Sequence, residues 1–236
     1  MLILHYRHLS TLLQHSRHTL HKAQSEAAHM LLDEIVQALN LPHSPIVTAE
    51  KGRPYFKDLP TVDFSLAHTD GFAICALQSC DNGTIPRVGV DAEARTHYSD
   101  AEIKRFSLRF FGKHEQDYIE NATDRQAAFT KVFVRKEAYA KYCGDGLGAH
   151  LSKTDTMAPE FEENKGVRFF SYLKKNIFIS LCNSRECDEE PAFLSPKGAE
   201  PDRSLQTKIS PAGGKSSCHI RICPRAFLLP EQIFVL

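Results

Sequence analysis

The sequence predicts an α/β (α+β) protein, and three observations support this fold class. A long amphipathic helical pattern near the N-terminus is followed by several short apolar runs, and two further helical patterns precede a second group of such runs. The composition is 42% hydrophobic and 25% charged, as in globular proteins. At 236 residues, the chain is long enough for one large domain or two small ones.

The first helix is predicted over residues 19–40, and Pro42 follows its end. Its apolar residues recur at steps of three and four: Leu20, Ala23, Ala27, Leu31, Ile35 and Leu39. Short apolar runs then indicate strands, with Gly, Pro, Asp and Asn between them. They read "PIVTA", "VDFSLAH", "GFAICAL" and "RVGVD".

A second group of helices follows. Ser99 and Glu102 have the spacing of a capping box and begin a helix that breaks near Gly112. Another helix is predicted from about Asp124, a suitable N-cap, to Cys143, where the glycines of "GDGLG" end it. The runs "VRFFSYL" and "NIFISLC" then predict two strands of a hairpin. The order is therefore helix, strands, helices, strands.

The segment 183–236 differs in composition. It holds half of the chain's 12 prolines, few apolar residues before "AFLLPEQIFVL" and no periodic run. We expect a divergent or partly mobile C-terminal extension.

Charge and cysteine usage limit the functional classes. A formal net charge of zero gives no basis for expecting nucleic-acid or membrane binding. The N-terminus lacks the apolar run of a signal peptide, so we expect a cytoplasmic protein whose 7 cysteines are reduced. Pairs with C-x4-C spacing include Cys182 with Cys187 and Cys218 with Cys223, near His219. Zinc is an alternative there, although the spacing is longer than the usual zinc knuckle.

The stretch "VGVDAE" places Asp91 and Glu93 two residues apart at the end of a predicted strand. Both side chains then project to the same side of the strand. A hard divalent cation such as Mg²⁺ would neutralise this pair of like charges. The alternative is two solvated carboxylates in a turn.

The helix "VFVRKEAYAKYC" carries Glu137 at the edge of its apolar stripe and Lys141 one turn later. Glu137 is a candidate third metal ligand or general base, and Lys141 a candidate cation for a phosphate. The alternative is a surface pair worth about 0.3 to 0.5 kcal/mol.

Two shorter motifs supply further candidates. His68 ends the strand of "FSLAHT" and could donate to a phosphate oxygen, although many such histidines are exposed turn residues. In "KGRPYF", Arg53 offers a planar charged group suited to phosphate or base stacking, and Pro54 fixes the backbone beside it.

Taken in order, these motifs resemble those of the 4'-phosphopantetheinyl transferase superfamily, in its larger monomeric class similar to the surfactin-synthetase activator. The motifs are G-R-P-x-F, F-S-x-A-H-T, G-V-D-x-E, F-F-x-x-x-E and F-x-x-K-E-A-x-x-K-x-x-G-x-G-L, and the resemblance covers about residues 17–182. It implies two similar α/β subdomains in a pseudo-twofold fold with the active site in the cleft between them. Residues 1–90 would form the coenzyme A nucleotide side, and 91–182 the metal and base side.

The resemblance also implies an activity: transfer of the 4'-phosphopantetheine group of coenzyme A to a serine of an apo acyl or peptidyl carrier protein. Mg²⁺ would assist, adenosine 3',5'-bisphosphate would be released, and the protein would be monomeric. Asp91, Glu93 and Glu137 would hold the metal, with Glu137 also the base. Lys141 would lie near the phosphates.

Further roles follow from the same resemblance. His68 would bind phosphate, Arg53 and Pro54 would lie beside the adenine, and Glu115 would support the site. Arg17 and Lys22 could meet the 3'-phosphate.

The chain departs from the family pattern at three positions. Ser65 and Ala67 replace the common Asn and Ser, and Phe133 replaces a common tryptophan. Two alternatives to transfer are a noncatalytic coenzyme A or carrier-binding relative and a Mg²⁺-dependent phosphodiesterase or nuclease.

Overall fold

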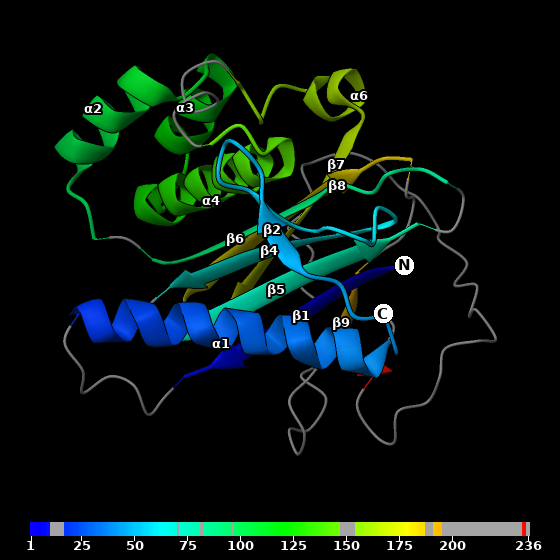
Figure 1. Cartoon of the computed structure of the whole chain (residues 1–236). Helices are drawn as coiled ribbons and strands as arrows, with labels where there is room; N and C mark the ends of the chain where they lie inside the picture. The colour runs from blue at the N-terminus through cyan, green and yellow to red at the C-terminus, as the bar shows by residue number, and fades with distance from the viewer. Residues whose placement is uncertain are drawn as a thin grey trace.

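Two units with the same strand order form the described part of the chain. The computed structural model describes residues 1–9, 17–69, 71–80, 83–95, 97–146, 154–186, 191–194 and 233–234. In each unit one strand is followed by a long helix and then by two more strands, and the third strand pairs between the other two. This repetition confirms a mixed α/β fold built from two similar parts (Figure 1).

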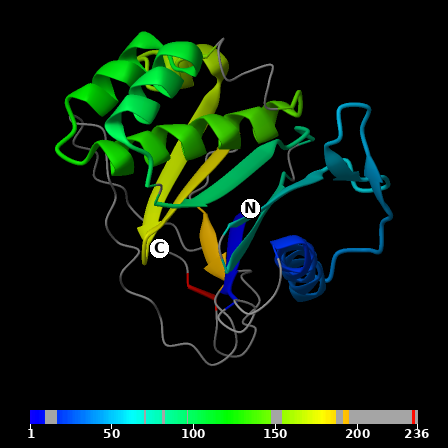
Figure 2. The same cartoon turned by 90° about the vertical axis from the view of Figure 1, so that its left-hand side faces the viewer.

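The first unit has the central strand order β1-β5-β4, with neighbouring strands antiparallel. A separate hairpin, β2 with β3, lies in the connection between its helix and β4, and stands away from the sheet in Figure 2. The elements are β1 (Leu2–His8), α1 (Arg17–Ala38), β2 (Ile46–Thr48), β3 (Pro54–Phe56), β4 (Val62–Thr69) and β5 (Phe72–Ser79).

The second unit has the order β6-β8-β7, again antiparallel. Its connection between the first two strands contains several helices rather than one. The elements are β6 (Val88–Ala94), α2 (Asp100–Phe110), α3 (Lys113–Glu120), α4 (Arg125–Cys143), α6 (Phe161–Lys165), β7 (Val167–Lys174) and β8 (Ile177–Ser184).

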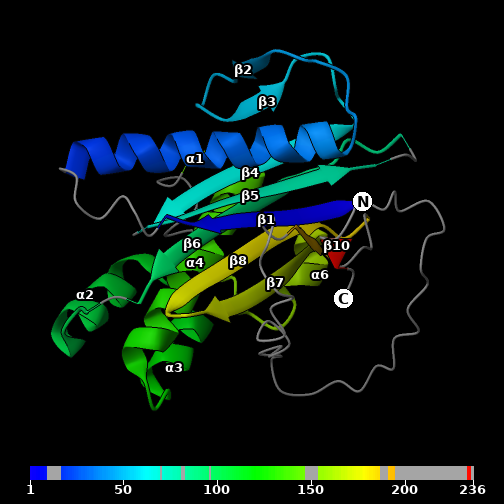
Figure 3. The same cartoon turned by 90° about the horizontal axis from the view of Figure 1, so that it is seen from below.

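The main core lies between the two sheets. One face of β1 and β5 packs against one face of β6 and β8 through residues such as Leu4, Ile74, Val90 and Ile179. The opposite face of the first sheet packs on α1, and the opposite face of the second sheet packs on α4. Figures 1 and 3 accordingly show α1 and α4 on opposite sides of the strands.

Side chains of β4 join the two units along the edge of β6. Asp63 accepts from the amide of Val88 at 2.8 Å, and Ser65 from that of Val90 at 3.0 Å. The Thr69 hydroxyl accepts from the amide of Ala94 at 3.3 Å. Each pair is separated by 25 residues, so the register along this seam is constant.

Arg53 reinforces this seam from the connection before β4. Its guanidinium forms an ion pair with Asp63 and donates to the carbonyl oxygens of Val88, at 2.9 Å, and Lys141. The side chains of Arg53 and Asp63 are only 9% and 10% exposed. One arginine therefore ties together β4, β6 and the end of α4.

The helices begin and end largely where the sequence predicts. Ser99 and Glu102 form the capping box of α2, the Asp124 carboxylate accepts from the amide of Ala127, and Gly144 ends α4 with a φ of 75°. The predicted hairpin is β7 with β8. The sequence did not indicate β1, β3, α3 and α6, which are short or have no clear apolar period.

Several expectations need correction or stay open. Cys75, Cys143 and Cys182 are free thiols, but Cys80 is disulfide-bonded, so the expectation of reduced cysteines is wrong there. Disulfide formation depends on which thiols the fold brings together, and spacing does not give this. The possible zinc ligands Cys187, Cys218, Cys223 and His219 lie outside the described residues, whereas Cys182 is buried in the core near α4.

The C-terminal extension and the subdomain boundary also stay predictions. Most of 183–236 lies outside the described residues, but β9 (Ala192–Leu194) pairs parallel to β1 and β10 (Ile233–Phe234) pairs with β9. The division at residue 90 falls within β6. No helix in the described segments is long and apolar enough to span a bilayer.

Replacing Asp63 by alanine is expected to lower the free energy of unfolding by about 3 kcal/mol, because it leaves Arg53 as a nearly buried, uncompensated charge. Urea unfolding would measure the change. Lys51→Ala removes the exposed ion pair with Asp145 and serves as the control, with an expected change below about 1 kcal/mol. Equal changes in the two variants would show that the seam does not depend on Asp63.

Candidate active site

Close packing of α4 on β6 begins at Gly89. A Cβ atom at this position would lie 2.1 Å from the carbonyl oxygen of Ala138 and 2.4 Å from the amide nitrogen of Tyr142. Only glycine allows the helix to approach the strand so closely. This approach explains the glycine of "VGVD" and brings Glu137 and Lys141 over the carboxylates of β6.

Asp91 lies at the centre of the candidate site. Its residue is 8% exposed, and Oδ1 accepts from the ammonium of Lys141 at 2.8 Å. Lys141 Nζ also donates to the carbonyl oxygen of Leu66 on β4, at 3.1 Å. The other oxygen, Asp91 Oδ2, is buried and has no hydrogen-bond partner among the described residues. Burial raises the pKa of Asp91, and the Lys141 charge opposes that shift.

Glu137 faces this carboxylate from α4. Burial, followed by repulsion from Asp91, raises the pKa of Glu137 to about 8, while Lys141 acts in the opposite direction. Glu93 also raises it, by a smaller amount. The Glu93 carboxylate accepts from the Thr69 hydroxyl at 3.0 Å. The fold therefore brings together the three acidic residues that the sequence proposed as a group.

The donor chemistry of this group fits a hard divalent cation. Asp91 and Glu93 lie close enough to Glu137 to oppose its ionisation, and one buried oxygen of Asp91 lacks a partner among the described residues. Lys141 at present supplies the compensating positive charge. Within the described segments, no three His, Cys, Asp or Glu side chains already have an arrangement that could hold a metal. Lys141 holds only Oδ1 of Asp91, so Oδ2 is the oxygen that is left for a cation.

His68 lies beside this group, half-buried at the end of β4. Its ring meets that of His21 on α1 edge to face, with centroids 4.7 Å apart. Burial, His21 and Lys141 all lower the pKa of His68. Several groups that can carry positive charge therefore meet next to the carboxylates, which is the arrangement that a bound phosphate would stabilise.

The remaining predicted residues are placed less directly at the carboxylates. Arg53 uses its guanidinium in the seam, and Pro54 is the half-buried first residue of β3. Lys22 is exposed, and its Nζ lies 3.9 Å from Glu26 Oε1. Arg17 begins α1, but its side chain lies outside the described residues.

Glu115 lies in a separate buried network. Its carboxylate accepts from the ammonium of Lys136 at 2.7 Å, from both the amide and the hydroxyl of Thr156, and from the amide of Gly112. Glu115 and Thr156 are 0% exposed and Lys136 is 1% exposed. Glu115 thus fixes α3 against α4 and the 154–156 segment.

Sequence reasoning missed three residues near the site: His21, Asp63 and Thr69. His21 is one of 12 histidines, and nothing in its neighbourhood in the sequence distinguishes it. Asp63 and Thr69 do carry a signal, because with Ser65 they lie at odd-numbered positions of β4 and alternate with mostly apolar residues. That alternation could have indicated a polar edge.

Glu137→Gln is expected to flatten the pH dependence of the unfolding free energy. Because folding raises the pKa of Glu137 from 4.5 to about 8, the folded protein keeps a proton that the unfolded chain releases. Stability therefore falls as pH rises through this window, by up to about 1.4 kcal/mol per pH unit for one carboxyl. Glutamine removes this contribution. Urea unfolding from pH 5 to 8 without divalent cations would measure it.

The control for this experiment is Glu163→Gln, an exposed change on α6. It should keep the wild-type slope. If Glu137→Gln also keeps that slope, Glu137 ionises in the folded protein as it does in the unfolded chain.

Comparison with known proteins supports the motif-based resemblance. Residues 87–189 match the family model of the 4'-phosphopantetheinyl transferase superfamily. L-aminoadipate-semialdehyde dehydrogenase-phosphopantetheinyl transferase of Saccharomyces cerevisiae is 24% identical over 175 residues, which cover 69% of this chain and 64% of that protein. 4'-Phosphopantetheinyl transferase Sfp of Bacillus subtilis is 33% identical over 106 residues, or 44% and 43% of the two chains.

A third relative is 4'-phosphopantetheinyl transferase psf-1 of Bacillus pumilus, 29% identical over 141 residues, or 54% of each chain. This chain thus spans less than two thirds of the length of each of these relatives. The matched family region contains all three acidic residues and Lys141. The comparisons therefore confirm the similarity of this chain to the 4'-phosphopantetheinyl transferase superfamily, in the class resembling the surfactin-synthetase activator.

Proposed function

We propose that this chain transfers the 4'-phosphopantetheine group of coenzyme A to a serine hydroxyl of an apo acyl or peptidyl carrier protein. The reaction is Mg²⁺-dependent and releases adenosine 3',5'-bisphosphate. The observation that carries this proposal is the buried meeting of Asp91 and Glu137 next to Lys141, which pairs with Asp91. Motifs far apart in the sequence supply these groups, and the family model covers all of them.

Asp91, Glu93 and Glu137 are the residues that would hold Mg²⁺. When bound, the cation supplies neutralisation of the pyrophosphate charge as the leaving group departs. Positive charge at these carboxylates would also offset the repulsion that raises the pKa of Glu137. Lys141, whose side chain is partly exposed, would face the phosphates.

Glu137 is also the proposed base. The carrier serine oxygen forms a bond to the β-phosphorus while the bond from that phosphorus to the bridging oxygen breaks. The serine proton goes to Glu137, directly or through a water molecule, and the bisphosphate leaves with the bridging oxygen. A carboxyl whose pKa lies near neutral pH suits this proton transfer. Positioning and charge neutralisation then supply most of the rate.

The first unit would bind the nucleotide part of coenzyme A. His68 lies between the carboxylate group and α1, where its ring can donate to a phosphate oxygen. Arg53 and Pro54 would lie beside the adenine, and the Nη1 and Nη2 groups of Arg53 already donate to the seam. Arg17 and Lys22 on α1 would meet the 3'-phosphate.

Each segment of the chain has its own proposed role. Residues 1–90 serve the nucleotide, 91–182 serve the metal and the base, and 183–236 form an extension. The protein would act as a cytoplasmic monomer on its carrier protein and coenzyme A, without nucleic acid or membrane.

The first test is to mix the chain with coenzyme A, Mg²⁺ and a panel of apo carrier proteins, and to weigh each carrier by intact mass spectrometry. We expect a gain of one phosphopantetheine group, which EDTA abolishes. Glu137→Ala should slow the transfer at least about 100-fold, whereas Glu163→Ala should leave it unchanged. If coenzyme A binds but no carrier gains mass, a noncatalytic relative becomes the better account.

His68→Ala tests the nucleotide side. Loss of one hydrogen bond to a charged phosphate is expected to raise KM for coenzyme A about 10-fold and to change kcat little. Steady-state kinetics at saturating carrier would measure both. The control is His29→Ala, an exposed histidine elsewhere on α1. An unchanged KM in the His68 variant would remove this residue from the coenzyme A site.

A further inference from the structure

A row of three polar residues crosses the second sheet beneath α4. Asp91 on β6 pairs directly with Ser180 on β8, and Ser180 pairs directly with Ser171 on β7. Two residues further along the same strands, Gly89 pairs with Cys182, and both residues contact α4. Side chains two residues apart share a face, so all three members of the polar row face the helix.

Ser180 has no evident structural role in this position. It is 1% exposed, and its hydroxyl has no hydrogen-bond partner among the described residues. Leaving a buried hydroxyl unpaired is unfavourable, and such groups in native proteins usually have a reason. The neighbouring Asp91 Oδ2 is buried and unpartnered in the same way.

The two unpartnered groups are neighbours across the strands. Side chains of directly paired residues have Cβ atoms about 4.5–5.5 Å apart. A serine hydroxyl can therefore reach a carboxylate oxygen of its cross-strand partner by rotation about χ1 or through one water molecule. Lys141 holds the other oxygen of Asp91 in this structure.

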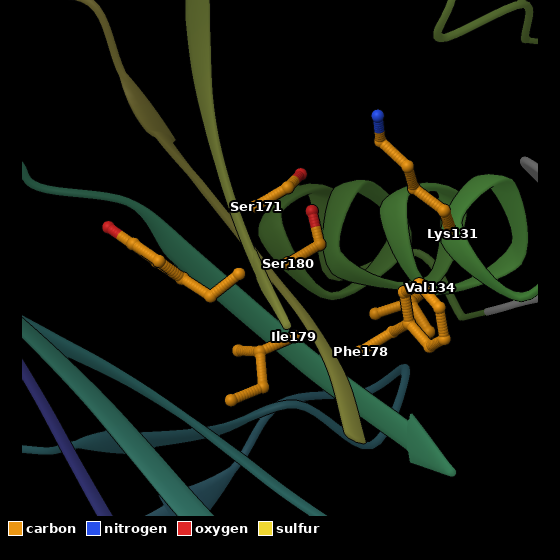
Figure 4. Close-up of a pocket in the computed structure, with 7 residues that line it drawn as sticks. Lys131, Val134, Ser171, Phe178, Ile179 and Ser180 are labelled. Atoms are coloured by element: carbon orange, nitrogen blue, oxygen red, sulfur yellow. The ribbon is translucent and has the colours of Figure 1, made fainter. Parts of the chain in front are cut away.

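A small cavity lies beside Ser180. It has a volume of about 10 Å³ and is lined by Lys131, Val134, Ser171, Tyr172, Phe178, Ile179 and Ser180. Figure 4 shows the hydroxyls of Ser171 and Ser180 pointing to the same side, toward α4. This volume is close to the minimum for one water molecule, so a water bonded to the Ser180 hydroxyl has room there, although Asp91 does not line the cavity.

We propose that Ser180 is a positioning residue for Asp91. With a divalent cation at the three carboxylates, the Ser180 hydroxyl would donate to Asp91, directly or through one water, and fix the orientation of the carboxylate. Carboxylates that bind metals are commonly held by such outer hydrogen bonds, and losing one typically costs about 10- to 100-fold in metal affinity or activity. This inference rests on the proposed metal site.

The test measures Mn²⁺ binding, by electron paramagnetic resonance in the presence of coenzyme A, and the Mg²⁺ dependence of transfer. Ser180→Ala is expected to raise the Kd for Mn²⁺ at least about 10-fold and to raise the Mg²⁺ concentration for half-maximal rate similarly. At saturating Mg²⁺, kcat should stay within about twofold of wild type. Ser171→Ala removes a hydroxyl from the same row and should leave both quantities unchanged.

A second pair of variants separates the hydroxyl from packing. Threonine and valine at position 180 have nearly the same shape, so Ser180→Thr should retain Mn²⁺ affinity and Ser180→Val should lose it. This comparison tests whether the hydroxyl is needed for Mn²⁺ affinity even if the alanine variant fails to fold. Equal Kd values for Ser180→Ala and Ser171→Ala, or for the threonine and valine variants, would overturn the proposal.

The same measurements distinguish this proposal from the proposed function. A wild-type chain that binds Mn²⁺ and responds to Ser180→Val, yet transfers nothing to any carrier, would overturn only the transfer reaction. A wild-type chain that transfers in Mg²⁺ with no response to position 180 would overturn only the role of Ser180. A wild-type chain that binds no Mn²⁺ would overturn the metal site and the role of Ser180 together.

Discussion

The ion pair of Arg53 with Asp63 is the interaction on which the arrangement of the two units depends. β4 and β6 are edge strands of different sheets, and edge strands leave backbone amides unpaired. Here the β4 side chains accept hydrogen bonds from those amides, and Arg53 compensates the charge of the first acceptor. Burial lowers the pKa of Arg53 and raises that of Asp63, and the charge of each partner opposes the shift of the other.

This seam also sets the position of the candidate active site. Lys141 donates to the carbonyl oxygen of Leu66 on β4 and to Asp91 on β6, and its own carbonyl oxygen accepts from Arg53. The site therefore lies where the two units meet. A change in the angle between the units would separate His68 and its neighbour on α1 from the carboxylates.

Two ion pairs along α4, one buried and one partly buried, serve different purposes. Lys136 with Glu115 is fully enclosed, with every oxygen of Glu115 hydrogen-bonded, and it fixes α3 and the 154–156 segment against the helix. The pair of Lys141 with Asp91 is not fully hydrogen-bonded, because Asp91 Oδ2 has no partner in the described part of the chain. The satisfied pair behaves as structure, whereas the unsatisfied one has capacity for a ligand.

The sequence by itself determined the elements with strong local signals. The apolar period of α1, the capping residues of α2 and α4 and the apolar runs of the β7–β8 hairpin follow from interactions within a few residues. The order of the motifs also indicated which acidic residues belong together. The comparisons support the family that those motifs suggested.

Only the tertiary structure decided which of those residues pair. Spacing could not show that Arg53 would be engaged by Asp63 and by two carbonyl oxygens, or that Glu115 would be enclosed with Lys136. Nor could it place Ser180 next to Asp91, since these residues are far apart in the chain and meet through strand register. Charge pairing and burial depend on distances between elements, and those distances follow from packing rather than from local sequence.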